Sequence, residues 1–147
     1  MVEYMLDGNV IDYLIDNNVD LDRARAVGTL YIASVQRSEL INVPDDRRRV
    51  SLAVALDQLA PTMIPVATPV WLDDMHWDDD SVWRDNPTEI ESAIYGNSEN
   101  ANRWKDAAIG GLAHENGYIL VTLDGPFRKR AEKVGLKSTS PKDLFGE

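Results

Sequence analysis

Four carboxylates of this sequence stand beside apolar segments, where an acidic side chain could bind a cation. They are Asp7, Glu39, Asp106 and Asp124. A carboxylate in such a place is costly to bury unless a positive charge neutralises it. Mg²⁺ and Mn²⁺ supply that charge, since these hard cations prefer carboxylate and water oxygens. Together the four acids predict a divalent-cation site.

Each acid taken alone has a simpler interpretation. An aspartate that follows a strand is often the N-cap of the next helix, which could explain Asp7 and Asp124. Asp106 lies early in a helical stretch, where a negative charge suits the helix dipole. The prediction of a cation site therefore depends on all four acids together.

Strand-like and helical segments alternate along the chain. Apolar β-rich runs predict strands at residues 2–6, 30–35, 63–66 and 118–123. Apolar periodicity, capping residues and breakers predict helices at residues 10–15, 21–27, 38–41, 45–60, 88–95, 102–115 and 126–134, and a last helical turn from Ser140. In the helix at 45–60, the inner face is expected to hold Val50, Ala53, Val54, Leu56 and Leu59.

This alternation predicts an α/β fold. Several of the strands are continuously apolar, as strands covered on both faces must be, which favours a mostly parallel sheet between two helical layers. We therefore expect a single domain over residues 1–147, built as a three-layer α/β/α sandwich. In such sheets ligands bind beyond the carboxyl ends of the strands, and Asp7 and Asp124 both fall at that edge.

Composition limits the classes of function. The chain has 147 residues, a net charge of −10 and no cysteine, so disulfides and thiolate metal sites are excluded. An acidic protein repels phosphate backbones, so action on nucleic acid requires bound cations or a local basic surface. Residues 62–102 are acidic, whereas residues 103–142 are basic. With no apolar run long enough for a membrane span and no basic leader, we expect a cytoplasmic protein with no membrane contact.

The order of these motifs resembles that of the PIN-domain metal-dependent ribonucleases, above all their toxin-like branch in bacterial toxin–antitoxin pairs. The sequence LDGN at 6–9 matches the opening strand, Asp, small residue and Asn of that family. SEL at 38–40, KDAAIGGLA at 105–113 and VTLD at 121–124 match its later motifs in the same order. The resemblance covers nearly the whole chain and is weakest across residues 69–100.

The resemblance implies an endoribonuclease that needs Mg²⁺ or Mn²⁺ and leaves a 5′-phosphate and a 3′-hydroxyl. Asp7, Glu39, Asp106 and Asp124 would be its catalytic and metal-binding residues. RNA would be the substrate, a small antitoxin protein the partner, and a homodimer the assembly. All four acids are present, so the sequence gives no sign that catalysis was lost.

Other residues are expected to support this site. Asn9 would hold the backbone or a neighbouring carboxylate by hydrogen bonds, and Thr122 could orient water or fill an interior strand position. Gly8 stands where the family usually has Thr or Ser, and we expect it to allow a sharp backbone turn. Candidate phosphate contacts are the basic side chains Arg128, Lys129, Arg130, Lys133, Arg103 and Lys105. A solvated helix face would explain the same basic run.

Three alternatives remain open. The chain could be a catalytically silent interaction module with this fold, or an RNA-processing nuclease outside any toxin system. A phospho-receiver domain is disfavoured, because Gln36 and Arg37 follow LYIASV where a receiver needs an aspartate.

The acidic stretch WLDDMHWDDDSVW at 71–83 fits no metal motif, and a solvated loop pinned by tryptophans explains it better.

Overall fold

A computed structural model of the protein describes residues 1–65, 67–69, 82–84 and 101–146. For residues 67–69, 82–84 and 101–105 it describes the backbone and not the side chains. The helix expected at 88–95 and nearly all of the acidic stretch at 71–83 lie outside the described residues.

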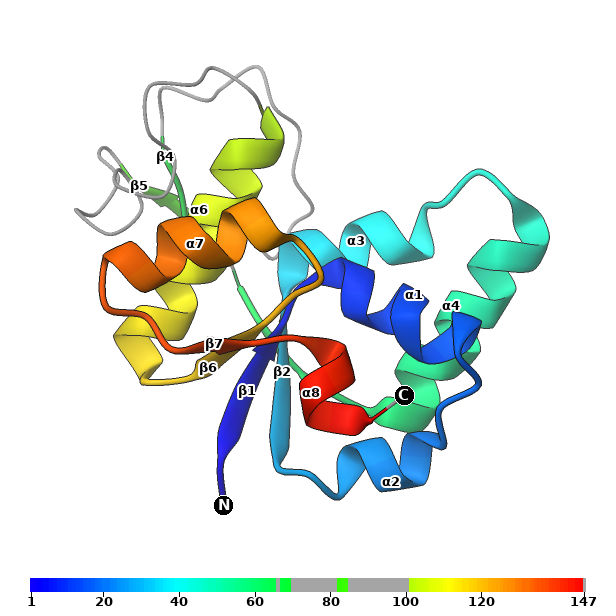
Figure 1. Cartoon of the computed structure of the whole chain (residues 1–147). Helices are drawn as coiled ribbons and strands as arrows, with labels where there is room; N and C mark the ends of the chain where they lie inside the picture. The colour runs from blue at the N-terminus through cyan, green and yellow to red at the C-terminus, as the bar shows by residue number, and fades with distance from the viewer. Residues whose placement is uncertain (66, 70–81, 85–100, 147) are drawn as a thin grey trace.

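A five-stranded parallel sheet forms the centre of the molecule, in the order β3-β2-β1-β6-β7 (Figure 1). Its strands are β1 (Glu3–Leu6), β2 (Thr29–Ala33), β3 (Thr62–Ile64), β6 (Ile119–Val121) and β7 (Ser138–Thr139). Two further short strands, β4 (Ala67–Pro69) and β5 (Val82–Arg84), pair in parallel with each other. The parallel sheet between helices confirms the predicted α/β class.

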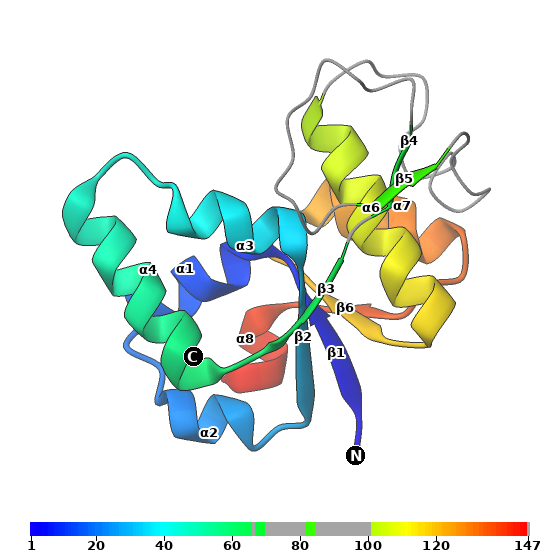
Figure 2. The same cartoon turned by 180° about the vertical axis from the view of Figure 1, so that it is seen from behind.

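Helices cover both faces of the sheet (Figures 1 and 2). They are α1 (Gly8–Asp16), α2 (Leu21–Arg25), α3 (Ser34–Ile41), α4 (Asp46–Leu59), α6 (Ala101–Asn116), α7 (Gly125–Lys133) and α8 (Pro141–Phe145). Residues of α1, α2, α4 and α8 pack into the core on one face, and residues of α6 and α7 pack into the core on the other. No helix within the described residues is long and apolar enough to cross a membrane.

Alternation along the central strands connects each strand to both cores. Met5 and Leu120 point into the core beneath α6 and α7, whereas their neighbours Leu6 and Val121 point into the core beneath α1 and α4. Successive side chains of a strand point to opposite faces, so a strand covered on both sides must be apolar at every position. This explains the unbroken apolar runs of the sequence.

The chain changes direction across the sheet between β1 and β6. From β1 it continues through α1 and α2 to β2 on one side, and from β6 it continues through α7 to β7 on the other. The two strands are adjacent, with Leu6 opposite Val121. Connections that diverge in this way open a crevice beyond the carboxyl ends of the two strands, where α/β sheets bind ligands. Asp7 and Asp124 are the acids that follow β1 and β6.

Two expectations about the helices differ from the structure. β2 ends at Ala33 and α3 begins at Ser34, so Glu39 lies in the second half of a helix rather than near its first turn. In α4 the expected inner face is partly wrong, since Val50 is 60% exposed and Val54 55% exposed. The buried residues of α4 are Leu52, Ala55, Leu56 and Leu59.

Candidate functional site

An open cavity of about 400 Å³ lies at the carboxyl edge of the sheet, and all four predicted acids line it. Asp7 comes from the end of β1, Glu39 from α3, Asp106 from α6 and Asp124 from the turn before α7. The remaining lining residues are Gly8, Asn9, Asp12, Gln36, Leu40 and Val43. The structure thus brings together acids that are up to 117 positions apart in the sequence, at the crevice between β1 and β6.

Asp7 is the most buried of these acids, with 7% of its surface exposed. One carboxylate oxygen, Oδ1, accepts a hydrogen bond from the Gly8 backbone N–H at 2.8 Å, which makes Asp7 the N-cap of α1. The other, Oδ2, accepts from the Thr122 hydroxyl at 2.7 Å. Capping and a place in the site are therefore compatible roles for one side chain.

The Asp7 carboxyl lies in an environment that disfavours its charge. Burial raises its pKa above the ordinary value of 3.8, and the Asp124 and Glu39 carboxylates raise it further. Hydrogen bonds from Thr122 and from the Gly8 N–H lower the pKa in part. A carboxyl destabilised by burial and by like charges is the kind of group that a bound cation would relieve.

Thr122 connects three parts of the site. Its buried hydroxyl donates a hydrogen bond to Asp7. The same hydroxyl accepts hydrogen bonds from the backbone N–H of Asp124 at 3.1 Å and from the Asn9 side-chain amide at 3.4 Å. Asn9 in turn accepts from the Leu123 backbone N–H at 3.2 Å. Together the side chains of Thr122 and Asn9 hold the turn after β6 against the start of α1. This turn carries Asp124, whose carboxylate caps α7 by accepting a hydrogen bond from the Phe127 N–H at 3.1 Å.

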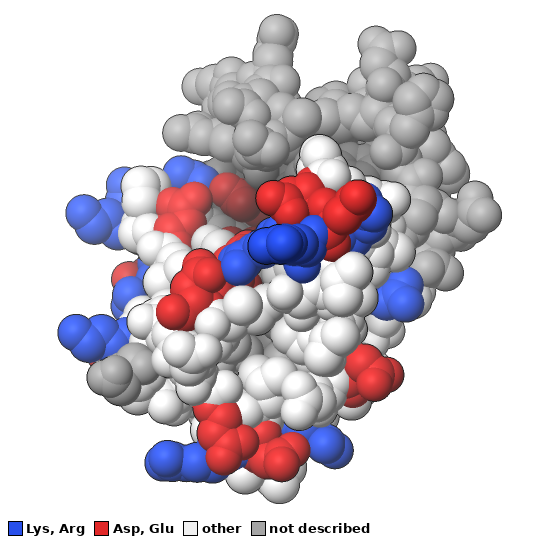
Figure 3. All heavy atoms as spheres, turned by 90° about the vertical axis from the view of Figure 1, so that its right-hand side faces the viewer, with Lys and Arg blue, Asp and Glu red and all other residues white. Residues whose placement is uncertain are grey.

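Asp106 and Asp12 each contact an arginine. Arg130 of α7 donates from Nη2 to Asp106 Oδ2 at 3.1 Å, so one residue of the predicted RNA-contacting run binds an acid of the site. Asp12, which was not among the predicted site residues, accepts hydrogen bonds from Arg48 of α4. Arg48 also pairs with Asp16 at 2.9 Å and so ties α4 to α1. Figure 3 shows basic side chains between acidic ones on the face that α1 and α4 form.

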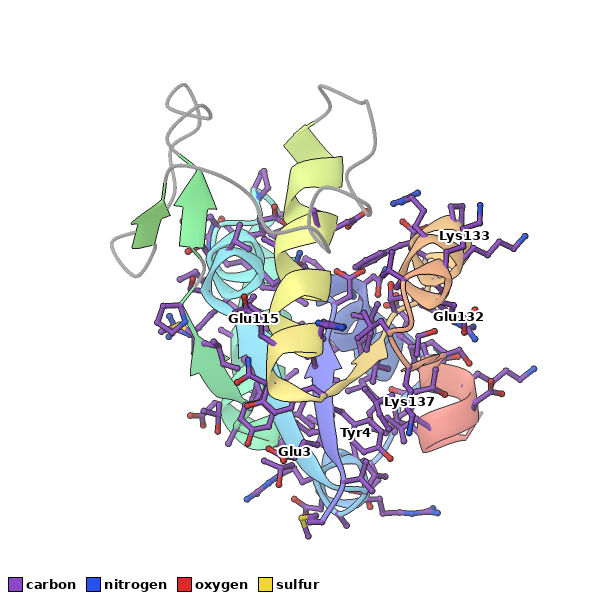
Figure 4. All side chains as sticks on the ribbon, turned by 90° about the vertical axis from the view of Figure 1, so that its left-hand side faces the viewer. Glu3, Tyr4, Glu115, Glu132, Lys133 and Lys137 are labelled. Carbon is purple, nitrogen blue, oxygen red and sulfur yellow. The ribbon has the colours of Figure 1, made fainter. Side chains whose placement is uncertain are left out.

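The predicted phosphate contacts are not equivalent. Lys129 and Lys133 are exposed, whereas Arg128 and Arg130 are half-buried. A helix rises 1.5 Å per residue, so Lys133 lies about 13 Å along α7 from Asp124. Figure 4 shows Lys133 on the outer side of α7, away from α6. The side chains of Arg103 and Lys105 lie outside the described residues.

Gly8 has a different role from the expected one. It does not adopt a left-handed φ, and it forms the first residue of α1. Its lack of a side chain leaves room for Gln36, because a Cβ atom at position 8 would lie 2.2 Å from Oε1 of Gln36. Gln36 also lines the cavity and was not among the predicted site residues, because an isolated glutamine at this place in the sequence does not indicate a site.

The lining residues fit a hard divalent cation in charge and in chemical type. Carboxylate oxygens from four elements face one cavity, and the buried Asp7 is disfavoured as an uncompensated anion. Among the described residues, no three acidic or histidine side chains already lie close enough together to hold one ion. Binding would therefore require carboxylate side chains to turn toward the ion.

Comparison with known proteins shows similarity of fold. No family model and no curated protein match the sequence. A PilT N-terminus domain protein of Sulfolobus solfataricus shares 11% identity over 98% of this chain and 91% of that chain, with a TM-score of 0.55. VapBC2 of Rickettsia felis, bound to a promoter DNA fragment, shares 17% identity over 95% of this chain and 98% of that chain, with a TM-score of 0.54. VapBC-1 of Haemophilus influenzae shares 15% identity over 96% and 99%, with a TM-score of 0.52.

Proposed function

We propose that this chain, which has the fold of PilT N-terminus (PIN) domain proteins, is a metal-dependent endoribonuclease and the toxin of a toxin–antitoxin pair. The observation that carries the proposal is the meeting of Asp7, Glu39, Asp106 and Asp124 around one open cavity at the crevice between β1 and β6. Helix capping alone does not explain why four carboxylates from four elements line one cavity. The raised pKa of Asp7 adds a physical reason for a cation at this place.

The four acids would hold Mg²⁺ or Mn²⁺. Such a cation, when bound, lowers the pKa of water and stabilises the charge that develops on phosphodiester oxygens during in-line attack. The chain's own contribution is to hold the acids in place: Thr122 orients Asp7, and Asn9 and Thr122 fix the turn that carries Asp124. Glu39 is exposed on α3, whereas Asp7 is buried.

RNA would approach this acidic cavity with its charge balanced by the cation and by basic side chains. Lys129 is exposed one turn into α7, and Arg128 and Arg130 lie half-buried beside it. The other proposed phosphate contacts are Lys133, Arg103 and Lys105. Phosphate contacts of this kind hold a strand in position without reading its sequence.

The proposed biological context is an antitoxin-controlled toxin in the cytoplasm. Two proteins of the same fold, VapBC2 and VapBC-1, are toxin–antitoxin proteins, which supports a small antitoxin as the partner of this chain. A homodimer is the proposed assembly. The second candidate, a silent interaction module, is favoured by the contact of Asp106 with Arg130, because that ion pair occupies one of the four acids.

The test is cleavage of a mixed RNA pool by the purified chain with Mg²⁺, with Mn²⁺ or with EDTA. We expect cleavage only with the divalent cation, and its loss in Asp7→Asn. Asp20→Asn is the matched control, because Asp20 caps α2 as Asp7 caps α1 but lines a different part of the surface. Metal-independent cleavage, or equal activity of the two variants, would contradict the proposal.

A second measurement separates the nuclease from the silent module. The chain is expressed alone from an inducible promoter, beside Asp7→Asn and Asp20→Asn, and growth is followed. A toxin that works by cleavage stops growth as the unchanged chain and as Asp20→Asn, but not as Asp7→Asn. Cleavage in the purified protein without any effect on growth would place the nuclease outside a toxin system.

A further inference from the structure

Gln36 reaches from α3 to the first backbone N–H of α1. Its Oε1 accepts a hydrogen bond from Gly8 N at 2.9 Å, and only 6% of the residue is exposed. The same N–H lies 2.8 Å from Asp7 Oδ1, so two acceptors share one donor. Gln36 stands three positions before Glu39, which places both side chains on the same side of α3, where both line the cavity.

Gly8 makes this contact possible. With a Cβ atom at position 8, the distance to Gln36 Oε1 would be 2.2 Å and to Gln36 Cδ 3.3 Å. A side chain at position 8 and the amide group of Gln36 at its present place therefore exclude each other. The backbone of Gly8 is ordinary, so alanine there would displace the end of the Gln36 side chain without straining the helix.

A shared donor has a consequence for Asp7. The N-terminal N–H groups of a helix have no acceptor within the helix, and a buried one left without a partner costs free energy. If Asp7 were the only acceptor, Oδ1 could turn toward a cation only by leaving the Gly8 N–H unbonded. Gln36 removes that cost, because its oxygen keeps the bond when Asp7 turns away.

We propose that Gln36 is a positioning residue, which holds the Gly8 N–H and thereby frees Asp7 Oδ1 to bind a divalent cation. This inference rests on the proposed function, because it assigns the cation to the Asp7 site. It gives Gln36 a role that depends on the cation: the amide oxygen is one of two acceptors without the cation and the sole acceptor with it.

The experiment is Mn²⁺ titration by isothermal calorimetry of the full chain after treatment with EDTA. We expect Gln36→Ala and Gly8→Ala each to weaken Mn²⁺ binding about fivefold, the scale of one neutral hydrogen bond. The double variant should be no weaker than either single one, because both substitutions remove the same contact. Gln58→Ala, at an exposed glutamine of α4, is the control and should bind as the unchanged chain does.

A purely structural role gives a different result. Loss of packing around Gln36 would lower the thermal unfolding temperature equally in EDTA and in excess Mn²⁺, and would leave the Kd for Mn²⁺ unchanged. An unchanged Kd in Gln36→Ala, or single effects that multiply in the double variant, overturns the inference. Gly8→Ala tests the same contact independently if Gln36→Ala does not fold.

Failure of the proposed function is recognisable separately. If the unchanged chain shows no saturable Mn²⁺ binding, or if Asp7→Asn binds as tightly, the cation site itself is wrong and the role of Gln36 falls with it. If the unchanged chain binds Mn²⁺ and Asp7→Asn does not, the site stands, and the Gln36 and Gly8 variants then decide this inference alone.

Discussion

The hydroxyl of Thr122 is the residue-scale feature on which the arrangement of the site depends most. It is fully buried and serves Asp7, Asn9 and the backbone of Asp124 at once. Thr122→Val keeps the shape and removes all three bonds, leaving a buried carboxylate oxygen and a backbone N–H without this partner. We expect a loss of about 2 kcal/mol in the free energy of unfolding, measured by urea denaturation. Thr62→Val, at an exposed position of β3, should change it by less than about 0.5 kcal/mol.

Asp7 should make stability depend on pH in an unusual direction. Its pKa in the folded chain is raised above 3.8, so the fold favours the protonated form and is less stable where the carboxyl is charged. Without metal, Asp7→Asn should therefore be more stable than the unchanged chain at pH 7. Each pKa unit of the shift corresponds to about 1.4 kcal/mol.

The pH range of this effect follows from the same shift. The difference between the two proteins should shrink as the pH falls through the folded pKa of Asp7 and vanish only below 3.8, where the carboxyl is protonated in both states. Urea unfolding in EDTA between pH 7 and pH 3 measures it, with Asp20→Asn as the control. A stability difference that stays constant over this range would show that burial of the charge is not its cause.

At the scale of elements, the basic side chains of α7 lie at different distances from Asp124. Lys129 lies about 7.5 Å along the helix from Asp124, and Lys133 lies about 6 Å further. For single-stranded RNA, each phosphate contact contributes about 0.7 to the slope of log affinity against log salt concentration. Lys129→Gln should reduce that slope by about this amount, and Lys133→Gln should reduce it less.

The measurement is fluorescence anisotropy of a labelled single-stranded RNA in EDTA, over a series of KCl concentrations. EDTA prevents cleavage while binding is followed. Lys142→Gln, at an exposed position of α8, controls for the loss of one positive charge from the whole chain. Equal effects of all three substitutions would mean that RNA responds to net charge and not to the border of the cavity.

Element types were predictable from the sequence where one local signal dominated. Asp45 and Ser140 cap the helices that were expected to begin at them. The inner face of α4 was only partly predictable, because two sets of apolar residues share the i, i+3, i+4 spacing and only packing selects Leu52 and Ala55 over Val50 and Val54. Strand β7 is two residues long, too short for any periodicity to show.

The site was predictable as far as its acids follow strands or begin helices. Gln36 and Asp12 line the cavity because of how the helices pack, and a single sequence does not show which helices contact each other. Asp12 did leave one signal, since it lies one helical turn after Gly8 and so on the side of α1 that faces Asp7. Gln36 left none, because its partner is a backbone N–H at residue 8 and backbone groups have no sequence signature.

At the scale of the whole molecule, a net charge of −10 makes the folded state sensitive to cations of any kind. General screening and specific binding can be separated by thermal unfolding. A cation that binds only the folded chain stabilises it by about 2.7 kcal/mol at a concentration of 100 times its Kd. For a chain of this size, such a gain raises the unfolding temperature by roughly 5–10 °C.

We expect that rise with Mn²⁺ or Mg²⁺ added to the EDTA-treated chain, and expect EDTA to reverse it. KCl at equal ionic strength should give a smaller rise, because it screens repulsion between acids without bridging the carboxylates of the cavity. Asp7→Asn should retain the response to KCl and lose most of the response to Mn²⁺, whereas Asp20→Asn should retain both. If Asp7→Asn keeps the full Mn²⁺ response, the stabilising ions lie elsewhere on this acidic surface, and the crevice between β1 and β6 is not the cation site.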